Sequence, residues 1–335
     1  MRNIVSKSNQ PLIYCVIPNW NGKDLLGQCL DSLLAQSHPV EVIVIDNGST
    51  DGSTKFLTTN YPTVVSIQND RNYGFTGGVN PGLQLALDEG ADYVALFNND
   101  AVAAPDWLQE LVQTAQKHPK AGIITGKFMR LDKKHLDSTG DFYSIYGLPL
   151  PRGRNQLDKG QYDAQTVVFG ATGGASLYRC DMLREIGLFD QDFFAYFEDV
   201  DISFRAQLAG WTVRFEPKAL AYHHVGATSS HLGTFSLYHS SKNFSLLYAR
   251  DMPAALFFKY LPLFWYQWFR WLATSTLRGH LWTYLKGNLR ALSLLPQTIR
   301  MRRRTQSSRK VSVQYIDDLL YRARPPKPRH IEAGK

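Results

Sequence analysis

The sequence predicts an α/β fold in which a mostly parallel sheet carries helices on both faces. Short apolar runs typical of buried strands alternate with segments whose apolar residues recur at helical spacing. Polar segments follow four of these runs, and parallel sheets bind ligands beyond the carboxyl ends of their strands. With 335 residues, 44% of them hydrophobic, the chain can form one large domain or one with a smaller appendage.

The apolar runs and helical repeats place these elements along the chain. The runs are bounded by proline, glycine or clusters of polar residues, which are signals that stop a strand. Apolar residues at spacings of three and four predict the helices between them. Strands are expected at 12–17, 40–45, 63–67, 93–97 and 122–125, and helices around 25–34, 83–87, 107–112 and 200–209.

The three cysteines indicate a reducing compartment. Cys15 falls in an expected strand, Cys29 in a helix and Cys180 at a helix start. Their spacing fits neither a disulfide framework nor a zinc site. Residues 1–10 are polar and lack the apolar run of a secretory signal, so we expect a cytoplasmic protein.

An acidic cluster at 198–201 is the strongest candidate for catalysis. Glu198, Asp199 and Asp201 follow an aromatic run, and burying carboxylates among aromatic rings is unfavourable without a compensating metal, cation or hydrogen bond. Carboxylates perturbed in this way are candidate general bases. The cluster also suits the first turn of a helix, where acidic side chains are favoured. The two interpretations are compatible.

Two polar segments suit contacts with a nucleotide. Asp46 ends the second expected strand, and its carboxylate can accept hydrogen bonds from a base or ribose beside the small residues of 47–53. An Asx turn with Ser53 capping the next helix explains these residues equally well. Segment 69–80 is rich in glycine and asparagine and leads into a helix, which suits an anion. It does not match G-x-G-x-x-G, and no P-loop motif occurs, so both classes of nucleotide site are disfavoured.

Asp100 is a candidate metal ligand at the end of the fourth expected strand. A carboxylate beside the carbonyl-bearing Asn98 and Asn99 suits a hard cation that also holds substrate phosphates. A turn before the helix that opens near Pro105 is the structural alternative.

Taken in order, these motifs resemble glycosyltransferase family 2, and within it a bacterial rhamnosyltransferase-type branch. Each motif is modest alone, but the ordered set over about residues 11–230 is highly specific. The matching segments are 17–22, 44–53, 72–80, 98–100, 173–175, 198–201 and 217–219, the last leading to His223.

The resemblance implies a GT-A type fold and transfer of a sugar from a nucleotide-sugar with inversion. It implies that Asp199 is the catalytic base and that Glu198 is its neighbour on the acceptor side. It further implies that Asp100 holds Mg²⁺ or Mn²⁺ on the donor diphosphate, with His223 or His224 approaching the metal or diphosphate. The implied donor contacts are Pro18, Asn19, Asp46, Asn72, Gly74 and Asn99.

One departure concerns the metal motif. Many relatives carry Asp-x-Asp, whereas Asn98 stands at the first position here, which puts strict metal dependence in doubt. The resemblance favours dTDP-L-rhamnose as donor, with UDP-hexose or UDP-N-acetylhexosamine close behind. The expected acceptor is a hydroxyl of a glycan or polyprenyl-linked glycan in bacterial cell-surface polysaccharide synthesis.

Other functional classes fit less well. A nucleotidyltransferase needs a glycine-rich basic loop after the first strand, which 18–23 does not provide. A non-catalytic glycan-binding or scaffold protein remains an alternative, although the joint presence of Asp46, Asp100 and Asp199 argues against it. A nucleic-acid binder would need stacking aromatics in the same groove as its cations and is not expected.

The chain divides near residue 235. We expect a GT-A catalytic domain at 1–235, with nucleotide-sugar binding at about 11–130 and the acceptor and base part at about 131–235. Residues 236–335 form a helical region rich in aromatic and basic residues.

This C-terminal region predicts a membrane-associating extension. Aromatic residues with interleaved cations suit helices lying in a membrane interface, and an arginine run after Ile299 adds attraction to anionic lipid. The longest candidate span, 254–277, is interrupted by Lys259 and Arg270, so we expect peripheral binding to the inner face of the cell membrane. Packing on the catalytic domain or a dimer contact is the alternative.

Overall fold

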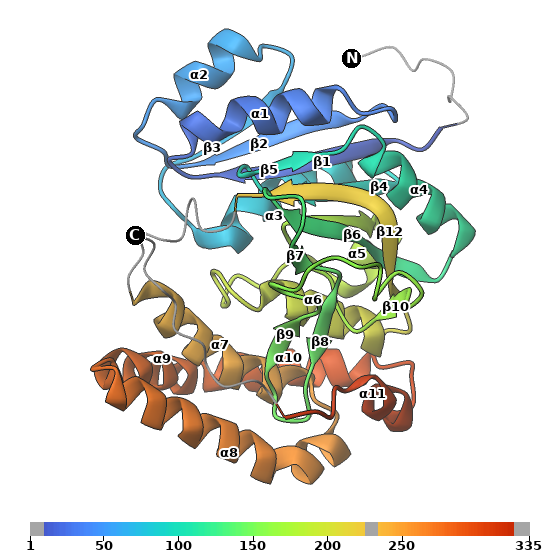
Figure 1. Cartoon of the computed structure of the whole chain (residues 1–335). Helices are drawn as coiled ribbons and strands as arrows, with labels where there is room; N and C mark the ends of the chain where they lie inside the picture. The colour runs from blue at the N-terminus through green and yellow to red at the C-terminus, as the bar shows by residue number, and fades with distance from the viewer. Residues whose placement is uncertain (1–9, 225–233, 325–335) are drawn as a thin grey trace.

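The computed structural model describes residues 10–224 and 234–324, and a mixed sheet of ten strands lies at the centre of this part (Figure 1). The main path runs, in spatial order, β10 (Val167–Val168), β12 (Thr212–His223), β6 (Ala121–Arg130), β11 (Ala175–Arg179), β4 (Tyr93–Phe97), β1 (Ile13–Asn19), β2 (Glu41–Asn47) and β3 (Val65–Asn69). Two short strands extend it: β5 (Ala101–Ala103) pairs with β12 and β7 (Leu136–Ser138) pairs with β6. A separate hairpin is formed by β8 (Asp141–Tyr143) and β9 (Pro149–Pro151).

The first four strands in the chain form the parallel half of the sheet. β4, β1, β2 and β3 pair in parallel, and their register brings Asn19 opposite Asp46 and Asn47 opposite Asn69. The carboxyl ends of these strands, with their polar residues, therefore meet at one edge. β11 enters the sheet antiparallel between β4 and β6, a strand that the sequence patterns did not predict. The α/β fold class is confirmed.

Helices cover both faces of the sheet and bury two separate apolar cores. One core packs the sheet against α1 (Lys23–Leu34), α2 (Ser53–Asn60) and α4 (Trp107–Lys117). The other packs it against α3 (Gly74–Asp88), α5 (Cys180–Ile186) and α6 (Glu198–Leu208). All three cysteines are buried and unpaired in these cores.

Helix α3 begins earlier than the sequence indicated. The segment up to Asn80 was expected to be a loop, yet the helix starts at Gly74. Glycine allows this start because Gly74 has a left-handed φ of +74°, and a Cβ at Gly82 would lie 2.7 Å from Val16 of β1. Small residues thus let the helix pack closely on the strand ends.

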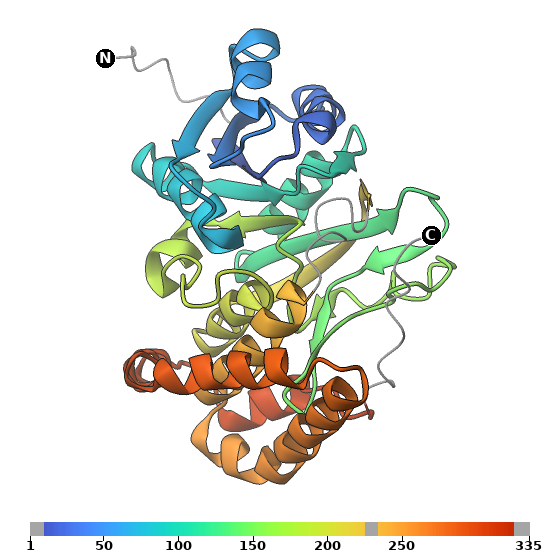
Figure 2. The ribbon, with the colours of Figure 1, turned by 90° about the vertical axis from the view of Figure 1, so that its left-hand side faces the viewer.

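The remaining helices form a layer below the sheet (Figures 1 and 2). They are α7 (Phe235–Asp251), α8 (Ala254–Leu277), α9 (Leu281–Ser293), α10 (Leu295–Ser307) and α11 (Val313–Leu319). A third apolar core joins this layer to Phe204 and Leu208 of α6 and to Tyr143 of β8. Within the described residues, no helix has the length and apolar character needed to cross a bilayer.

Candidate functional site

A cavity of about 670 Å³ opens beyond the carboxyl ends of the parallel strands. It brings together nine of the ten residues that the sequence marked as candidates. These are Pro18, Asn19, Asn72, Gly74, Asn99, Asp100, Glu198, Asp199 and His223. Segments far apart in the chain therefore meet in one site.

Asp46 is the one candidate that does not line the cavity. Its carboxylate is buried and accepts hydrogen bonds from the Thr54 hydroxyl and, at 3.2 Å, from the Ser49 N–H. Both partners follow it in the chain, so a local turn of the kind weighed from the sequence is present. The carboxylate shapes the loop after β2. The expected capping by Ser53 is wrong, because Gly52 is the N-cap residue of α2 and the Ser53 hydroxyl donates to Asp51.

Asn47, the next residue, holds the donor side of the cavity together. Its Nδ2 donates to the Gly74 carbonyl at 2.8 Å and to Asn72 Oδ1 at 3.0 Å. Its Oδ1 accepts from Asn69 Nδ2 at 2.9 Å and from the Tyr73 N–H at 3.1 Å. One buried amide thus joins the end of β2 to the loop before α3, a role that sequence reasoning missed.

Asp100 and His223 also line the cavity. His223 Nε2 is 3.2 Å from Asp100 Oδ1, and Nδ1 is 2.8 Å from Asp137 Oδ2. The His223 ring stacks on Phe128 with centroids 4.6 Å apart. Burial by itself lowers the pKa of His223, but the carboxylates of Asp100 and Asp137 outweigh it and raise this pKa to about 9.

These residues fit a divalent metal. Within the described residues, buried Asp100 Oδ1 accepts no hydrogen bond of good geometry, and its partner is His223 Nε2 at 3.2 Å, so the oxygen keeps acceptor capacity that a cation could use. Among the residues that the structure describes, no cluster of three His, Cys, Asp or Glu side chains could hold a metal. The protein would supply Asp100 and His223, and the remaining ligands would come from the donor diphosphate and water, an arrangement usual for Mg²⁺.

The acidic cluster divides into groups with different surroundings. Asp199 reaches the cavity and accepts from the Gly173 N–H at 3.1 Å and from the Val200 N–H at 2.9 Å. Burial raises the pKa of Asp199 more than these hydrogen bonds lower it. Glu198 is buried in the same wall, and its Oε2 has no hydrogen-bond partner. Asp201 instead forms a buried ion pair with Arg205 at 2.7 Å.

The turn before α6 supports both interpretations of the cluster. Phe197 caps the helix, and three acidic residues occupy its first turn. The cluster is therefore both a helix start and part of the cavity wall.

Asp137, Asp141 and Arg154 are cavity residues that sequence reasoning missed. Arg154 pairs with Asp137 at 3.0 Å. Burial, and then the charge of Asp199, raises the pKa of Asp141 well above its usual range. These residues lie in a segment of very short strands without clear periodicity, so only a stretch of polar residues, DSTGD at 137–141, marked it.

An aromatic loop, residues 193–197, closes one side of the cavity. Phe194, Tyr196 and Phe197 line it, and all three have left-handed φ values between 64° and 69°. Such backbone is unfavourable for bulky side chains, at about 1–2 kcal/mol per residue. Strong contacts must therefore hold the loop, and most of them come from α7.

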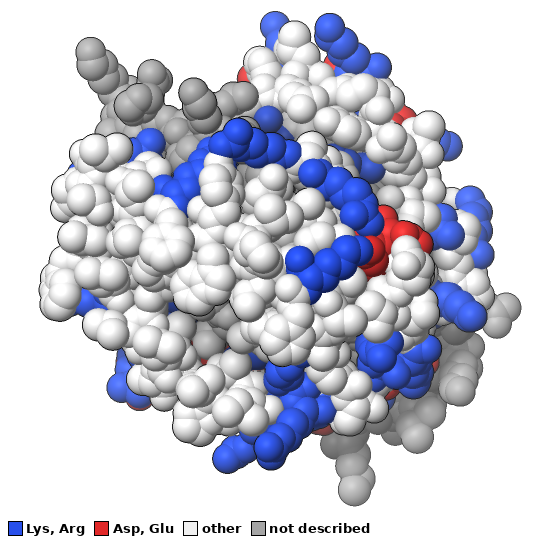
Figure 3. Space-filling model, turned by 90° about the horizontal axis from the view of Figure 1, so that it is seen from below, with Lys and Arg blue, Asp and Glu red and all other residues white. Residues whose placement is uncertain are grey.

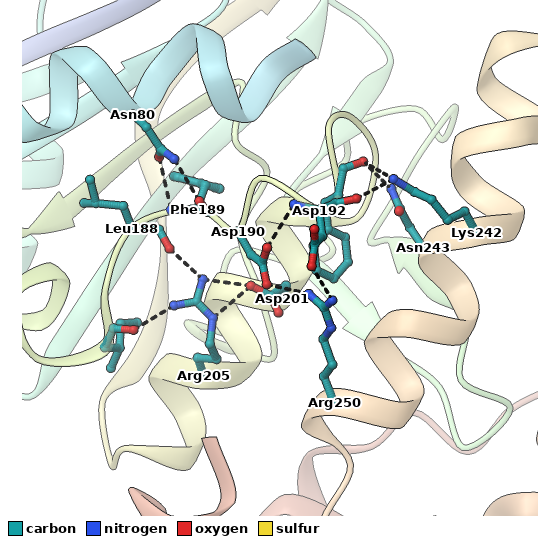
Figure 4. Close-up of polar contacts among 12 residues, drawn as sticks. Asn80, Leu188, Phe189, Asp190, Asp192, Asp201, Arg205, Lys242, Asn243 and Arg250 are labelled. Atoms are coloured by element: carbon teal, nitrogen blue, oxygen red, sulfur yellow. Dashed lines mark hydrogen bonds and ion pairs between the residues drawn. The ribbon is translucent and has the colours of Figure 1, made fainter. Parts of the chain in front are cut away.

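Three polar side chains of α7 hold this loop (Figure 4). Asn243 Nδ2 lies 2.9, 2.8 and 2.6 Å from the carbonyl oxygens of Phe193, Ala195 and Tyr196. Lys242 Nζ donates to the carbonyls of Asp192 and Phe193, and the Arg250 guanidinium pairs with Asp190 and Asp192. The helical layer therefore fixes the chain that leads directly into Glu198 and Asp199.

Comparison with known proteins gives the same picture at the level of sequence. A model of the family described as glycosyl transferase family 2 matches residues 14–187. An N-acetylglucosaminyl-diphospho-decaprenol L-rhamnosyltransferase of Mycobacterium tuberculosis is 28% identical over 214 residues, which are 57% of this chain and 68% of that protein. A poly-beta-1,6-N-acetyl-D-glucosamine synthase of Staphylococcus epidermidis is 25% identical over 61% of this chain and 47% of its own length.

The fold also resembles that of solved glycosyltransferases. A mannosyltransferase from Pyrobaculum calidifontis, solved with GDP-Man and Mn²⁺, aligns with a TM-score of 0.54 and 16% identity. The alignment covers 92% of this chain and 86% of that one.

Proposed function

This chain belongs to glycosyltransferase family 2 and is a glycosyltransferase, and from that premise we propose that it transfers L-rhamnose from dTDP-L-rhamnose to a glycan hydroxyl with inversion. The identity to a rhamnosyltransferase supports the choice of sugar. The observation that carries the proposal is the convergence of Asp100, Glu198 and Asp199 on one cavity at the strand ends.

The proposed step is a single displacement at the anomeric carbon. Asp199 accepts the proton of the acceptor hydroxyl as its oxygen forms a bond to that carbon, and the bond from carbon to the diphosphate breaks. The nucleoside diphosphate leaves with the electron pair of that bond. Glu198 Oε2, which has no hydrogen-bond partner among the described residues, is available to hydrogen-bond an acceptor hydroxyl. Asp199, half-buried with a raised pKa, is a stronger base than an exposed aspartate.

Asp100 and His223 would hold the Mg²⁺ or Mn²⁺ that neutralises the departing diphosphate. Mn²⁺ accompanies GDP-Man in the Pyrobaculum structure, and the buried Asp100 carboxylate, whose Oδ1 accepts no well-aligned hydrogen bond within the described residues, supports a metal here. The donor would contact residues that line the same cavity, namely Pro18, Asn19, Asn72, Gly74 and Asn99. Transfer that proceeds unimpaired in EDTA would remove the metal from this proposal.

The substitution Asp199→Asn tests the base. We expect it to abolish transfer while nucleotide still binds, measured as a change in the fluorescence of Trp20, which lines the cavity. Asp158→Asn is a matched control, because Lys127 keeps its second partner Asp163 at 2.8 Å and turnover should remain normal. Near-normal turnover in Asp199→Asn would refute the assignment.

A donor panel tests the sugar. Release of a nucleoside diphosphate from dTDP-rhamnose supports the proposal, whereas faster release from UDP-hexose or UDP-N-acetylhexosamine supports the alternative donor. Release of pyrophosphate would indicate a nucleotidyltransferase, and no release would support a non-catalytic glycan-binding protein.

The acceptor we propose is a polyprenyl-linked glycan at the inner face of the cell membrane. Support comes from the mycobacterial relative, which is an N-acetylglucosaminyl-diphospho-decaprenol L-rhamnosyltransferase. Under this proposal the protein is cytoplasmic and works in cell-surface polysaccharide synthesis. The division near residue 235 into a catalytic domain and a helical region remains a prediction.

A further inference from the structure

The helical layer has a one-sided charge. Residues 252–316 include eleven Lys and Arg and no Asp or Glu, although the whole chain has 29 acidic residues. Seen from below, the layer shows Lys and Arg side chains over a largely uncharged surface, with acidic side chains gathered toward one side (Figure 3). Residues 252–316 therefore contain no carboxylate that would repel an anionic partner.

The same layer exposes an unusual amount of apolar surface. Of the eighteen large hydrophobic side chains that are exposed within the described residues, eleven lie between residues 258 and 299. Phe258 is 71% exposed, Trp282 62% and Leu277 89%. A soluble surface rarely carries so many apolar side chains close together unless it binds something.

On α8 the exposed residues form a stripe along the helix. Phe258, Pro262, Trp265 and Phe269 recur at spacings of three and four and face outward, while Tyr260 and Phe264 are buried against the core. The helix is thus apolar on two faces, of which the structure covers only one. α9 continues the exposed surface with a tryptophan and several leucines.

We propose that the outer face of α8 and α9 docks on an anionic lipid surface. Tryptophan and phenylalanine insert at the boundary between headgroups and acyl chains, and Lys and Arg attract anionic headgroups. A second copy of this chain fits the face less well, because two cationic surfaces repel each other.

The structure changes which cations make this contact. The sequence pointed to the arginine run after Ile299, but Arg302 of α10 turns inward and donates to the carbonyls of Ala249 and Met252 at 2.7 and 2.8 Å. Lys286 and Arg290 of α9 are exposed beside the apolar residues. Arg300, Arg303 and Arg304 of α10 remain exposed, whereas Lys259 of α8 pairs with Asp317 at 2.8 Å, so the docking cations are Lys286 and Arg290 together with these three arginines.

The position of this face relative to the cavity suits an acceptor carried on a lipid. Phe235, the first residue of α7, and Leu150 of β9 line the cavity. The β8–β9 hairpin touches α8, where the rings of Tyr146 and Tyr266 lie 6.0 Å apart. The cavity wall and the docking face thus belong to one packed unit. The inference extends the proposed lipid-linked acceptor, but it can be tested without any substrate.

The test is sedimentation of the full chain with lipid vesicles. Wild type should bind vesicles that contain phosphatidylglycerol and not vesicles of phosphatidylcholine alone. Reversing two docking cations, Lys286→Glu with Arg290→Glu, should weaken binding to the anionic vesicles by about tenfold or more, since each cation near such a surface contributes about 1 kcal/mol. The matched control Lys55→Glu with Lys117→Glu changes the net charge equally on exposed residues of α2 and α4 and should bind like wild type.

A second pair of variants tests the apolar part. Phe269→Ser with Trp282→Ser should lower the binding that remains at high salt, where attraction between charges is screened. Nucleotide binding and the melting temperature show whether these variants fold. Equal binding by all four proteins, or no binding by wild type, would overturn the inference. So would a wild-type dimer that the apolar pair converts to a monomer without any vesicle binding.

Discussion

Replacing Asn243 with alanine should damage acceptor use more than donor binding. Asn243 is fully buried on α7 and reaches three carbonyl oxygens of the aromatic loop (Figure 4). The amide nitrogen has two hydrogens to share among these oxygens, and each full hydrogen bond contributes about 0.5–1.5 kcal/mol, so Asn243→Ala should remove about 1–3 kcal/mol. The loop also has three residues with left-handed backbone, each of which costs about 1 kcal/mol or more. Without the Asn243 amide, the loop is therefore expected to change conformation.

A relaxed loop would displace the acceptor wall first. The donor wall is held mainly by Asn47 and by strand pairing, but it also meets the aromatic loop where the Thr76 N–H donates to the Phe194 carbonyl at 3.2 Å, so nucleotide affinity should fall less than acceptor use. The ratio kcat/KM for the acceptor should fall by at least about tenfold, which corresponds to 1.4 kcal/mol of lost transition-state stabilisation. Initial rates of nucleoside diphosphate release at varied acceptor concentration measure this ratio, and Trp20 fluorescence measures nucleotide binding.

Asn288→Ala provides the control for a general loss of stability. Asn288 lies on α9 and accepts a hydrogen bond from Trp268 Nε1 at 2.7 Å, but it does not touch the aromatic loop. The substitution Asn288→Ala should lower the melting temperature and leave the acceptor kinetics unchanged. The reasoning fails if Asn243→Ala lowers stability and leaves acceptor kinetics intact, or if donor and acceptor parameters fall together.

Three further predictions concern the other walls of the cavity. Asp137→Asn should weaken Mn²⁺ binding by about 10–100-fold in calorimetric titrations with nucleoside diphosphate, because the Asp137 carboxylate orients the His223 ring. An unchanged affinity for Mn²⁺ would contradict this. Gly74→Ala should lower both the melting temperature and nucleotide affinity, because its Cβ would lie 2.3 Å from a carbonyl oxygen of the aromatic loop. Gly90→Ala is the control, because Gly90 has a similar φ but open space around it. Its free energy of unfolding should fall only by the cost of a left-handed alanine, about 1–2 kcal/mol. Arg154→Gln should shift the acid limb of the pH–rate profile to higher pH, since Arg154 lowers the pKa of Asp199, which must be deprotonated to act; an unmoved limb would count against Asp199 as the base.

Local patterns in the sequence were sufficient to predict the parallel half of the fold. The strands β1, β2 and β4 are short, largely buried and apolar, and polar residues follow each of them, so their pattern is clear without any tertiary information; β3, at the edge of the sheet, is at most half-buried. Asp100 and Asn19 could be assigned to one edge of a sheet for the same reason. The start of α3 could not, because glycines usually indicate a loop, and here they permit close packing.

Residues whose role depends on distant segments could not be predicted. Asp137 matters because His223 lies beside it, 86 residues later in the chain. Asn243 matters because its amide meets a loop 47 to 50 residues earlier. Asp46 shows the opposite case: its position suggested a ligand contact, but neighbouring hydroxyl and N–H groups take up its carboxylate. Hydrogen bonds over such distances leave no periodic pattern.

The two sides of the cavity are held by different parts of the chain, and this bears on how acceptor choice can vary. The donor wall rests on strand ends within residues 14–187, the part that the family model covers. The aromatic loop lies beyond residue 187 and is held by α7, which also lies outside that match. A change in α7 therefore acts first on the acceptor wall and reaches the donor wall less directly, through the contact between Thr76 and Phe194. We accordingly expect relatives matched over the first segment to resemble this chain in how they bind a donor, and to differ in acceptor as their helical layers differ.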